Sequence, residues 1–160
     1  MEQVEVYLGL GTNLGERERN LMQAVTLLDQ LLGAAPERLS RILETPSWGF
    51  EGPDFLNMCI VYSLPRTGTP EEQAHWILEK AKEVEAAMGR KPAPLRDDAG
   101  KRLYEDRIID IDLLFYGTER VALPDLTVPH PLIAERDFVK IPLKEIAKPA
   151  LKKAFPEIFM

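Results

Sequence analysis

The chain has 160 residues, of which 45% are hydrophobic and 29% are charged, values typical of one soluble globular domain with a core of its own. The net charge of −6 argues against proteins that coat nucleic acid or lie on a membrane surface, and no apolar run reaches the roughly 20 residues of a membrane span. A single cysteine, Cys59, and an acidic N-terminus without a signal-peptide pattern fit a reducing compartment, so we expect one cytoplasmic, monomeric domain over residues 1–160 with no nucleic-acid or membrane partner.

The first part of the chain predicts a strand followed by a helix. Apolar residues alternate with other residues over positions 4–10, which is the period of a strand with one buried face. The glycine-rich turn 9–15 is compatible with a phosphate cradle, but the absence of a P-loop pattern favours a tight turn, with Asn13 and Glu16 as a helix-capping pair. Apolar residues at helical spacing then predict a helix that Gly33 ends.

Two strands with an aromatic loop between them follow. A strand is expected near residues 39–44, and the loop 45–54 is either a hydrophobic lid on the core, the alternative that loop character favours, or one wall of a pocket for a flat ligand. Residues 55–64 predict the next strand, with Phe55 and Asn57 on the face opposite its apolar row. The Asn57 amide then needs a partner, either the backbone or the edge of a planar heterocycle that stacks on Phe55.

A second helix and a long irregular segment occupy the centre of the chain. Thr69 with Glu72 three residues later marks a helix start, and Gly89 marks its end. His75 on this helix is interpreted as a surface residue without a partner nearby in sequence. The segment 90–106 is either a solvated loop of mixed charge or a lid that brings cations onto phosphates, and its position before the strand described next favours the lid. Its cations and the one that follows it are Arg90, Lys91, Arg96, Lys101, Arg102 and Arg107.

The stretch 107–117 is typical of a β-strand that carries two carboxylates. Because residues two apart share a face, the expected core-facing row is Ile109, Ile111, Leu113 and Phe115. Asp110 and Asp112 then lie on the other face, about 7 Å apart. An unpaired buried charge is costly and Mg²⁺ prefers carboxylate oxygens, so this pair is a candidate metal site. A sheet face open to water, on which the two carboxylates only add solubility, is the alternative.

The C-terminal part predicts a rigidly held histidine and a helical end. His130 lies between Pro129 and Pro131, which favour an extended backbone, so that it either contacts a phosphate or caps a neighbouring loop. A helix is expected near Glu135, and residues 141–147 return toward the core. The order of elements is that of an α+β, ferredoxin-like βαββαβ sandwich, with an antiparallel sheet, helices on one face and a long lid loop, which leaves the other face for ligands.

Taken together, these motifs resemble the 6-hydroxymethyl-7,8-dihydropterin pyrophosphokinase family of folate biosynthesis. The most specific part is the R-x-x-D-x-D strand at 107–112, followed by T-V-P-H at 127–130. The other matching pieces, in the family's order, are residues 8–14, 44–46, 52–57, 88–90, 135–138 and 142–147. The chain departs from the family where Tyr104, Glu105 and Asp106 stand in place of an aromatic-Gly-Pro sequence, which affects the residues that close the lid on ATP.

The resemblance implies that ATP donates its β,γ-diphosphate to the hydroxymethyl group of the pterin and leaves as AMP. It implies two Mg²⁺ ions held by Asp110 and Asp112, with Asp112 also a candidate base and ATP as the co-substrate. The residues expected to be catalytic are Arg90, Arg107, Asp110 and Asp112. The residues expected to bind ATP are Glu85, Arg90, Arg107, Leu113, His130 and Arg136. The residues expected to bind the pterin are Thr45, Pro46, Trp48, Phe55, Asn57 and Phe138.

Three other classes fit the residues less well. An RNA-binding module on this fold conflicts with the acidic composition and the absence of an RNP1-like pattern. A nucleotidyltransferase would place its carboxylates soon after the glycine turn, whereas here the turn ends at Gly15 and the pair begins at Asp110. An ATP-binding regulatory domain would need no carboxylate pair and would not turn over ATP.

Overall fold

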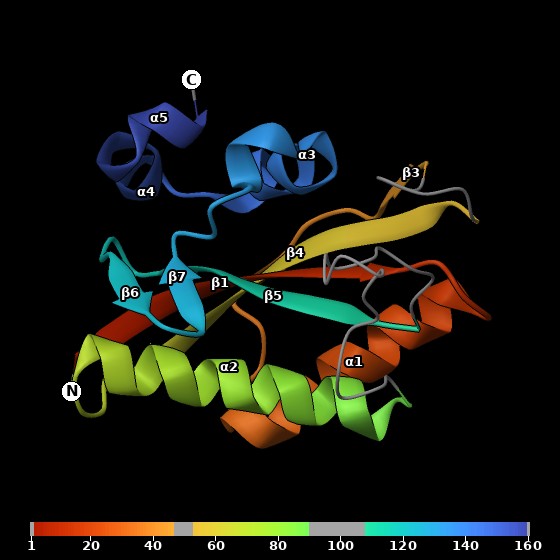
Figure 1. The fold of residues 1–160 in the computed structure, drawn as a ribbon, viewed down its shortest axis with the longest axis horizontal. Coiled ribbons are helices and arrows are strands. Elements are labelled where there is room, and N and C mark those ends of the chain that lie inside the picture. Colours follow the sequence, from red (N-terminus) through yellow and green to blue (C-terminus); the bar gives the residue numbers. More distant parts are fainter. Residues whose placement is uncertain (1, 47–52, 90–107, 160) are drawn as a thin grey trace, which may run out of the picture.

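A computed structural model describes residues 2–46, 53–89 and 108–159, and its centre is a five-stranded sheet (Figure 1). The strands are β1 Gln3–Thr12, β2 Arg38–Leu39, β3 Leu43–Thr45, β4 Phe55–Pro65 and β5 Asp110–Tyr116. The order is β2-β4-β1-β5, β3 also pairs with β4, and every pair is antiparallel. The expected α+β fold with ferredoxin-like strand order is confirmed, with the second strand of that motif divided into β2 and β3.

Two long helices cover one face of the sheet. They are α1 Arg17–Leu32 and α2 Pro70–Ala87, and both lie below the sheet in Figure 1. The predicted start of α2 is confirmed, because the Thr69 side chain accepts from the Glu72 N–H and the Glu72 side chain accepts from the Thr69 N–H. Gly33 ends α1 in the left-handed conformation, as expected. The expected capping pair at the start of α1 is wrong, because Glu16 is the N-cap without a side-chain bond and the Asn13 amide donates to the Pro53 carbonyl.

The opposite face of the sheet carries a second helical layer. It consists of α3 Asp137–Ile146, α4 Pro149–Ala154 and α5 Pro156–Phe159, preceded by the short 3-10 turn η1 Ile133–Glu135. A hairpin of β6 Val121–Leu123 and β7 Leu126–Val128 connects β5 to this layer. The helices expected on one face are therefore α1 and α2 alone, and the C-terminal helices lie on the other face. The C-terminal helices bury a second core that includes Tyr7, Phe115 and Leu143, so only part of the opposite face is left for ligands.

An irregularity in β5 divides its side chains differently from the prediction. Leu8 of β1 pairs with Leu113 and Tyr7 pairs with Phe115, so Leu114 is an extra residue, as in a β-bulge. Leu113 packs in the core under α1 and α2, whereas Leu114 and Phe115 both pack against the C-terminal helices. The prediction that Phe115 shares the face of Leu113 is wrong because the extra residue resets the alternation of faces.

A cluster of charged side chains ties the C-terminal layer to the sheet. The Glu5 carboxylate is 2.7 Å from Lys148 Nζ and 3.4 Å from Arg38 Nη2, and Arg38 Nε donates to the Ile146 carbonyl at 3.1 Å. Burial by itself raises the pKa of Glu5, but the hydrogen bonds from Lys148 and Arg38 outweigh it and hold the pKa below its ordinary value. Charges from β1, β2 and the segment after α3 thus join three parts of the chain.

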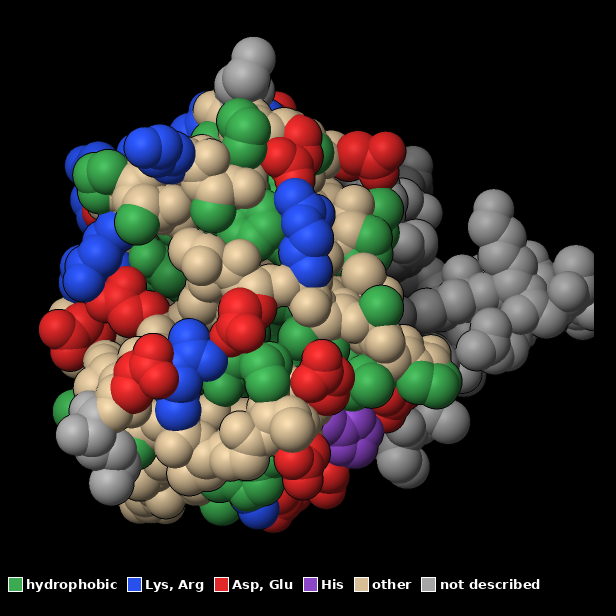
Figure 2. All heavy atoms as spheres, turned by 90° about the vertical axis from the view of Figure 1, so that its left-hand side faces the viewer, with side chains coloured by type: hydrophobic (Ala, Val, Ile, Leu, Met, Phe, Trp, Pro, Cys, Tyr) green, Lys and Arg blue, Asp and Glu red, His purple; other side chains and the backbone are tan. Residues whose placement is uncertain are grey.

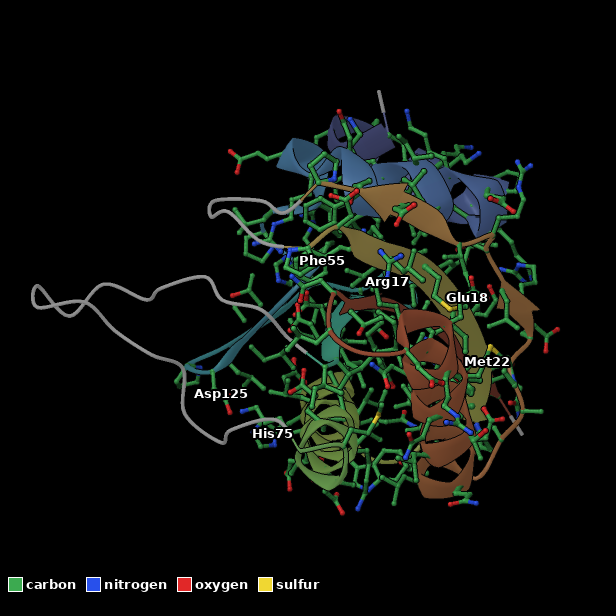
Figure 3. All side chains as sticks on the ribbon, turned by 90° about the vertical axis from the view of Figure 1, so that its right-hand side faces the viewer. Arg17, Glu18, Met22, Phe55, His75 and Asp125 are labelled. Atoms are coloured by element: carbon green, nitrogen blue, oxygen red, sulfur yellow. The ribbon has the colours of Figure 1, made fainter. Side chains whose placement is uncertain are left out.

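His75 has partners on two elements, contrary to the expectation. Its Nδ1 lies 2.8 Å from Glu79 Oε1 and its Nε2 lies 2.9 Å from Asp125 Oδ2, so it connects α2 to the β6–β7 hairpin (Figure 3). Residues four apart on a helix are neighbours, which is the signal for Glu79 that the sequence interpretation missed. The hydrogen bond to Asp125, followed by the one to Glu79, raises the pKa of His75.

Candidate active site

Two glycines of β1 lie opposite the two carboxylates of β5. Gly11 pairs with Asp110, and Gly9 pairs with Asp112. The sequence interpretation placed these glycines in a turn, but β1 continues through both of them to Thr12. Glycine has no side chain, so nothing projects from β1 beside each carboxylate. The two-residue spacing of the glycines, which matches the period of a strand face, is the signal that could have revealed this open part of the sheet surface.

Three of the residues expected to bind the pterin lie together on the same face. Asn57 of β4 pairs with Gly11, so that this glycine separates Asn57 from Asp110. Asn57 is buried, and its Nδ2 donates to Thr45 Oγ1 at 2.9 Å, a partner that neither sequence-based alternative included. Thr45 pairs with Phe55, two residues before Asn57, so Thr45, Phe55 and Asn57 share one face.

His130 lies beside the second carboxylate. Its Nε2 is 3.9 Å from Asp112 Oδ1, while its Nδ1 accepts from the Leu132 N–H at 3.2 Å. The loop-capping role that the sequence left open is therefore present. The pKa of His130 is lowered to about 4, chiefly by burial and also by the charge of Arg136, while Asp110 acts in the opposite direction. At neutral pH the ring is uncharged, and its Nε2–H faces Asp112.

The first residues around α3 complete the C-terminal side of the site. Arg136 directly precedes α3, and its guanidinium lies 5.8 Å from the centroid of the Phe138 ring. Phe138 is partly buried against the C-terminal core. Since Arg136 also acts on the pKa of His130, its charge lies near the carboxylate face of the sheet. His130 and Arg136 thus bring a neutral imidazole and a cation to the side of Asp112, and the Phe138 ring lies beside the cation.

Glu85 and Leu113 contribute in ways that the sequence did not indicate. Glu85 Oε2 accepts from the Ile111 N–H at 2.8 Å, so α2 holds the edge strand at the residue between the two aspartates. Leu113 is only 2% exposed, and its side chain packs in the core under the helices, so its expected contact with ATP stays a prediction.

Other expected site residues lie outside the described residues. These are Trp48, Arg90 and Arg107, together with the lid and its cations Arg96, Lys101 and Arg102. Pro46, the last described residue after β3, is exposed. The roles given to these residues from the sequence stay predictions.

The carboxylate pair suits a hard cation that shares its ligands with a substrate. Within residues 2–46, 53–89 and 108–159, no group of three or more His, Cys, Asp or Glu side chains is arranged to hold a metal ion. Asp110 and Asp112 supply only carboxylate oxygens, the ligand type that Mg²⁺ takes when phosphates and water complete its shell. The donor set therefore fits Mg²⁺ brought with a phosphate-bearing molecule better than a metal held by protein alone.

Comparison with known proteins gives one consistent result. The family described as 7,8-dihydro-6-hydroxymethylpterin-pyrophosphokinase (HPPK) matches residues 7–148. A 2-amino-4-hydroxy-6-hydroxymethyldihydropteridine pyrophosphokinase of Porphyromonas gingivalis is 39% identical over 144 residues, covering 89% of this chain and 90% of the relative. The enzyme of the same description from Aquifex aeolicus is 37% identical over 142 residues, covering 88% of this chain and 79% of the relative.

A solved structure supports the fold. The crystal structure of an HPPK-DHPS in complex with substrates has a TM-score of 0.61 and 12% sequence identity, over 98% of this chain. This chain spans 43% of the length of that protein. At this identity the likeness concerns the fold alone.

Proposed function

Because the chain belongs to the 7,8-dihydro-6-hydroxymethylpterin-pyrophosphokinase family, we propose that it carries out its reaction on the sheet face of Asp110 and Asp112. The chain is a pyrophosphokinase of folate biosynthesis, which moves the β,γ-diphosphate of ATP to the hydroxymethyl group of 6-hydroxymethyl-7,8-dihydropterin and releases AMP. The observation that supports this location is the row Asn57, Gly11 and Asp110 across three strands, in which a glycine leaves room between an amide and a carboxylate.

The metal assignment rests on the two aspartates. Asp110 and Asp112 hold two Mg²⁺ ions that accompany ATP, and their oxygens are the ligands that this ion prefers. When bound, Mg²⁺ supplies charge neutralisation on the phosphates and a lower pKa for the attacking hydroxyl. Glu85 supports this arrangement from α2, because its bond to the Ile111 N–H fixes the strand that carries both carboxylates.

The phosphates of ATP lie next to the C-terminal side of this face. His130 offers an uncharged Nε2–H as a hydrogen-bond donor, and Arg136 offers a positive charge. Arg90 and Arg107 add charge from the segment before β5 and stabilise the charge that develops on the departing AMP. These groups position the diphosphate and neutralise it, which is most of what catalysis of phosphoryl transfer requires.

The pterin lies toward β3 and β4. Its ring stacks between Phe55 and Phe138, and the buried Asn57 amide, held by Thr45, reads its polar edge. Pro46 and Trp48 add contacts from the loop after β3. Because Asn57 is already oriented by Thr45, its hydrogen bonds to the ligand are preorganised.

The enzyme acts on small molecules and works as a cytoplasmic monomer in this proposal. The face drawn in Figure 2 shows acidic and basic side chains interspersed. The helices in the described ranges lack the combination of length and apolar character that a membrane span needs. The single cysteine is buried, in keeping with a reducing compartment.

Gly11→Ala is expected to raise the KM for the pterin by about tenfold, equivalent to about 1.4 kcal/mol of lost binding. A Cβ at this position would lie 3.0 Å from Asn57 Oδ1 and 3.6 Å from Phe55 Cδ1, so the Asn57 amide would have to shift from the position in which it bonds Thr45. Steady-state kinetics with each substrate varied in turn would measure the change.

Gly9→Ala is the matched control, in the same strand and on the same face. A Cβ there would lie 3.4 Å from Leu114 Cδ1, an ordinary contact, so the KM for the pterin should change by less than about twofold. If the two variants raise this KM equally, the assignment of Asn57 and Phe55 to the pterin is wrong.

Removal of divalent cations tests the metal assignment. With EDTA, AMP formation should fall to background and return when Mg²⁺ is added in excess. Electron paramagnetic resonance of Mn²⁺, with a non-hydrolysable ATP analogue and the pterin present, should count two bound ions in the unmodified protein and fewer in Asp110→Asn. Undiminished activity in EDTA, or an equal ion count in the two proteins, would contradict the assignment.

A further inference from the structure

We infer that Arg17, the first residue of α1, is a positioning residue for the pterin site, an inference that rests on the function proposed above. Arg17 Nη1 donates to Glu44 Oε2 at 2.6 Å and to the Asp54 carbonyl at 2.9 Å. Figure 3 shows the Arg17 and Phe55 labels close together at the same end of the sheet. One guanidinium therefore holds two segments that are ten residues apart in the chain and meet at the end of the β3–β4 ladder.

The two partners of Arg17 directly precede two residues assigned to the pterin. Glu44 precedes Thr45, and the Asp54 carbonyl belongs to the peptide bond that leads to Phe55. Thr45 and Phe55 are the last pair of the β3–β4 ladder. A shift of the Asp54 carbonyl would therefore be passed on to Phe55 through a single peptide unit, which is planar and rigid.

Arg17 acts from the face opposite the substrate. Glu44 pairs with Leu56, whose side chain packs in the core under α1, whereas Thr45 and Phe55 share the face of Asn57. The guanidinium is thus on the face of the sheet that α1 and α2 cover, and the proposed pterin site is on the opposite face. Arg17 positions the pterin residues without contact to the ligand.

The turn between β1 and α1 provides a second attachment to the segment that leads into β4. The Asn13 side chain, 1% exposed, donates from Nδ2 to the Pro53 carbonyl at 3.1 Å. Two consecutive carbonyls, of Pro53 and Asp54, are therefore held by side chains of the β1–α1 turn and the start of α1. Because β3 has only three residues and pairs with β4 alone, its own ladder gives this corner little rigidity.

Because the ion pair of Arg17 and Glu44 is exposed, its loss should have only a local effect on the structure. The side chains of Arg17 and Glu44 are 31% and 52% exposed, and exposed ion pairs contribute little to the stability of a whole fold. Loss of Arg17 should therefore change the placement of Thr45 and Phe55 while the thermal unfolding midpoint stays nearly constant. That combination separates positioning from general support of the fold.

The test compares Arg17→Ala, Arg17→Lys and the control Arg19→Ala. Arg19 lies on the same helix, is 78% exposed and contacts only Glu16, at 3.3 Å, among the ion pairs of the described residues. For Arg17→Ala the KM for the pterin should rise about tenfold while the KM for ATP stays within about twofold. Arg17→Lys should recover part of the loss, since an ammonium can donate to either partner but lacks the planar fork. Arg19→Ala should behave like the unmodified protein.

Two results would overturn the inference: an unchanged pterin KM in Arg17→Ala, or equal rises in both KM values with a lowered unfolding midpoint. Failure of the proposed function has a different signature, because the unmodified protein would then form no AMP. In that case calorimetric titration with the pterin, in the presence of a non-hydrolysable ATP analogue, still decides the inference. Arg17→Ala must bind the pterin more weakly than Arg19→Ala does, and equal affinity would refute the role.

Discussion

Asp112→Ala is expected to fold normally and to lose diphosphate transfer by about a thousandfold or more in kcat, since it removes a carboxylate that neutralises the transferring group. Asp112 lies opposite Gly9, and its Oδ1 is 3.9 Å from His130 Nε2, so its removal takes a ligand from the centre of the proposed site. Asp110→Ala should have an effect of similar size, because the two carboxylates share one face of β5. Initial rates of AMP formation, with Mg²⁺ and both substrates saturating, measure the loss.

Asp125→Ala serves as the matched control for this result. Asp125 is exposed on the β6–β7 hairpin, where it contacts His75, and Figure 3 shows it away from Phe55. Its replacement should leave kcat within about twofold of the unmodified protein, in line with ordinary surface substitutions. Full activity of Asp110→Ala or Asp112→Ala would remove the basis for the metal site, whatever the stability of the variants.

Phe115→Ala is expected to lower the free energy of unfolding by about 3–5 kcal/mol, the usual cost of deleting a buried aromatic ring. The Phe115 side chain is 0% exposed, and its ring centroid lies 5.8 Å from that of Tyr7, 5.3 Å from Phe155 and 5.9 Å from Phe159. It thus joins β1 to the C-terminal layer. Urea unfolding followed by circular dichroism measures the change.

Phe115→Leu serves as the control, because it removes the aromatic ring but keeps an apolar side chain at this position. A leucine keeps most of the apolar volume, so the expected cost is only about 1–2 kcal/mol. A cost below about 1 kcal/mol for Phe115→Ala would contradict the conclusion that this ring anchors the C-terminal helices. Because Phe138 lies on α3 and Arg136 directly precedes it, release of the C-terminal helices should weaken binding of both substrates.

Local signals in the sequence were sufficient for the long strand β4, for the start of α2 and for the end of α1. The alternation in β4 placed Phe55 and Asn57 opposite the core row, and the pattern at Thr69 and Glu72 gave the start of α2. These features depend on residues close together in the chain. The bulge at Leu114 was missed because a strict two-residue period has no place for an extra residue.

The sequence named residues for the candidate site, but it did not give their arrangement across the strands. The sequence identified Asp110 and Asp112 as a pair on one strand face, yet nothing local indicates that Gly11 separates Asp110 from Asn57. The helical end was expected, but that its helices cover the second face of the sheet was missed for a related reason. Its helices are short, and what identifies their buried side is contact with β1 and β5, more than a hundred residues earlier in the case of β1.

The most direct test of the whole account is the identity of the nucleotide product. The protein is incubated with ATP, Mg²⁺ and 6-hydroxymethyl-7,8-dihydropterin, and nucleotides and pterins are separated and quantified. The account predicts AMP and pterin diphosphate in equal amounts. ADP would mean transfer of the γ-phosphate alone, and AMP attached to the pterin would mean nucleotidyl transfer; either product would contradict the account.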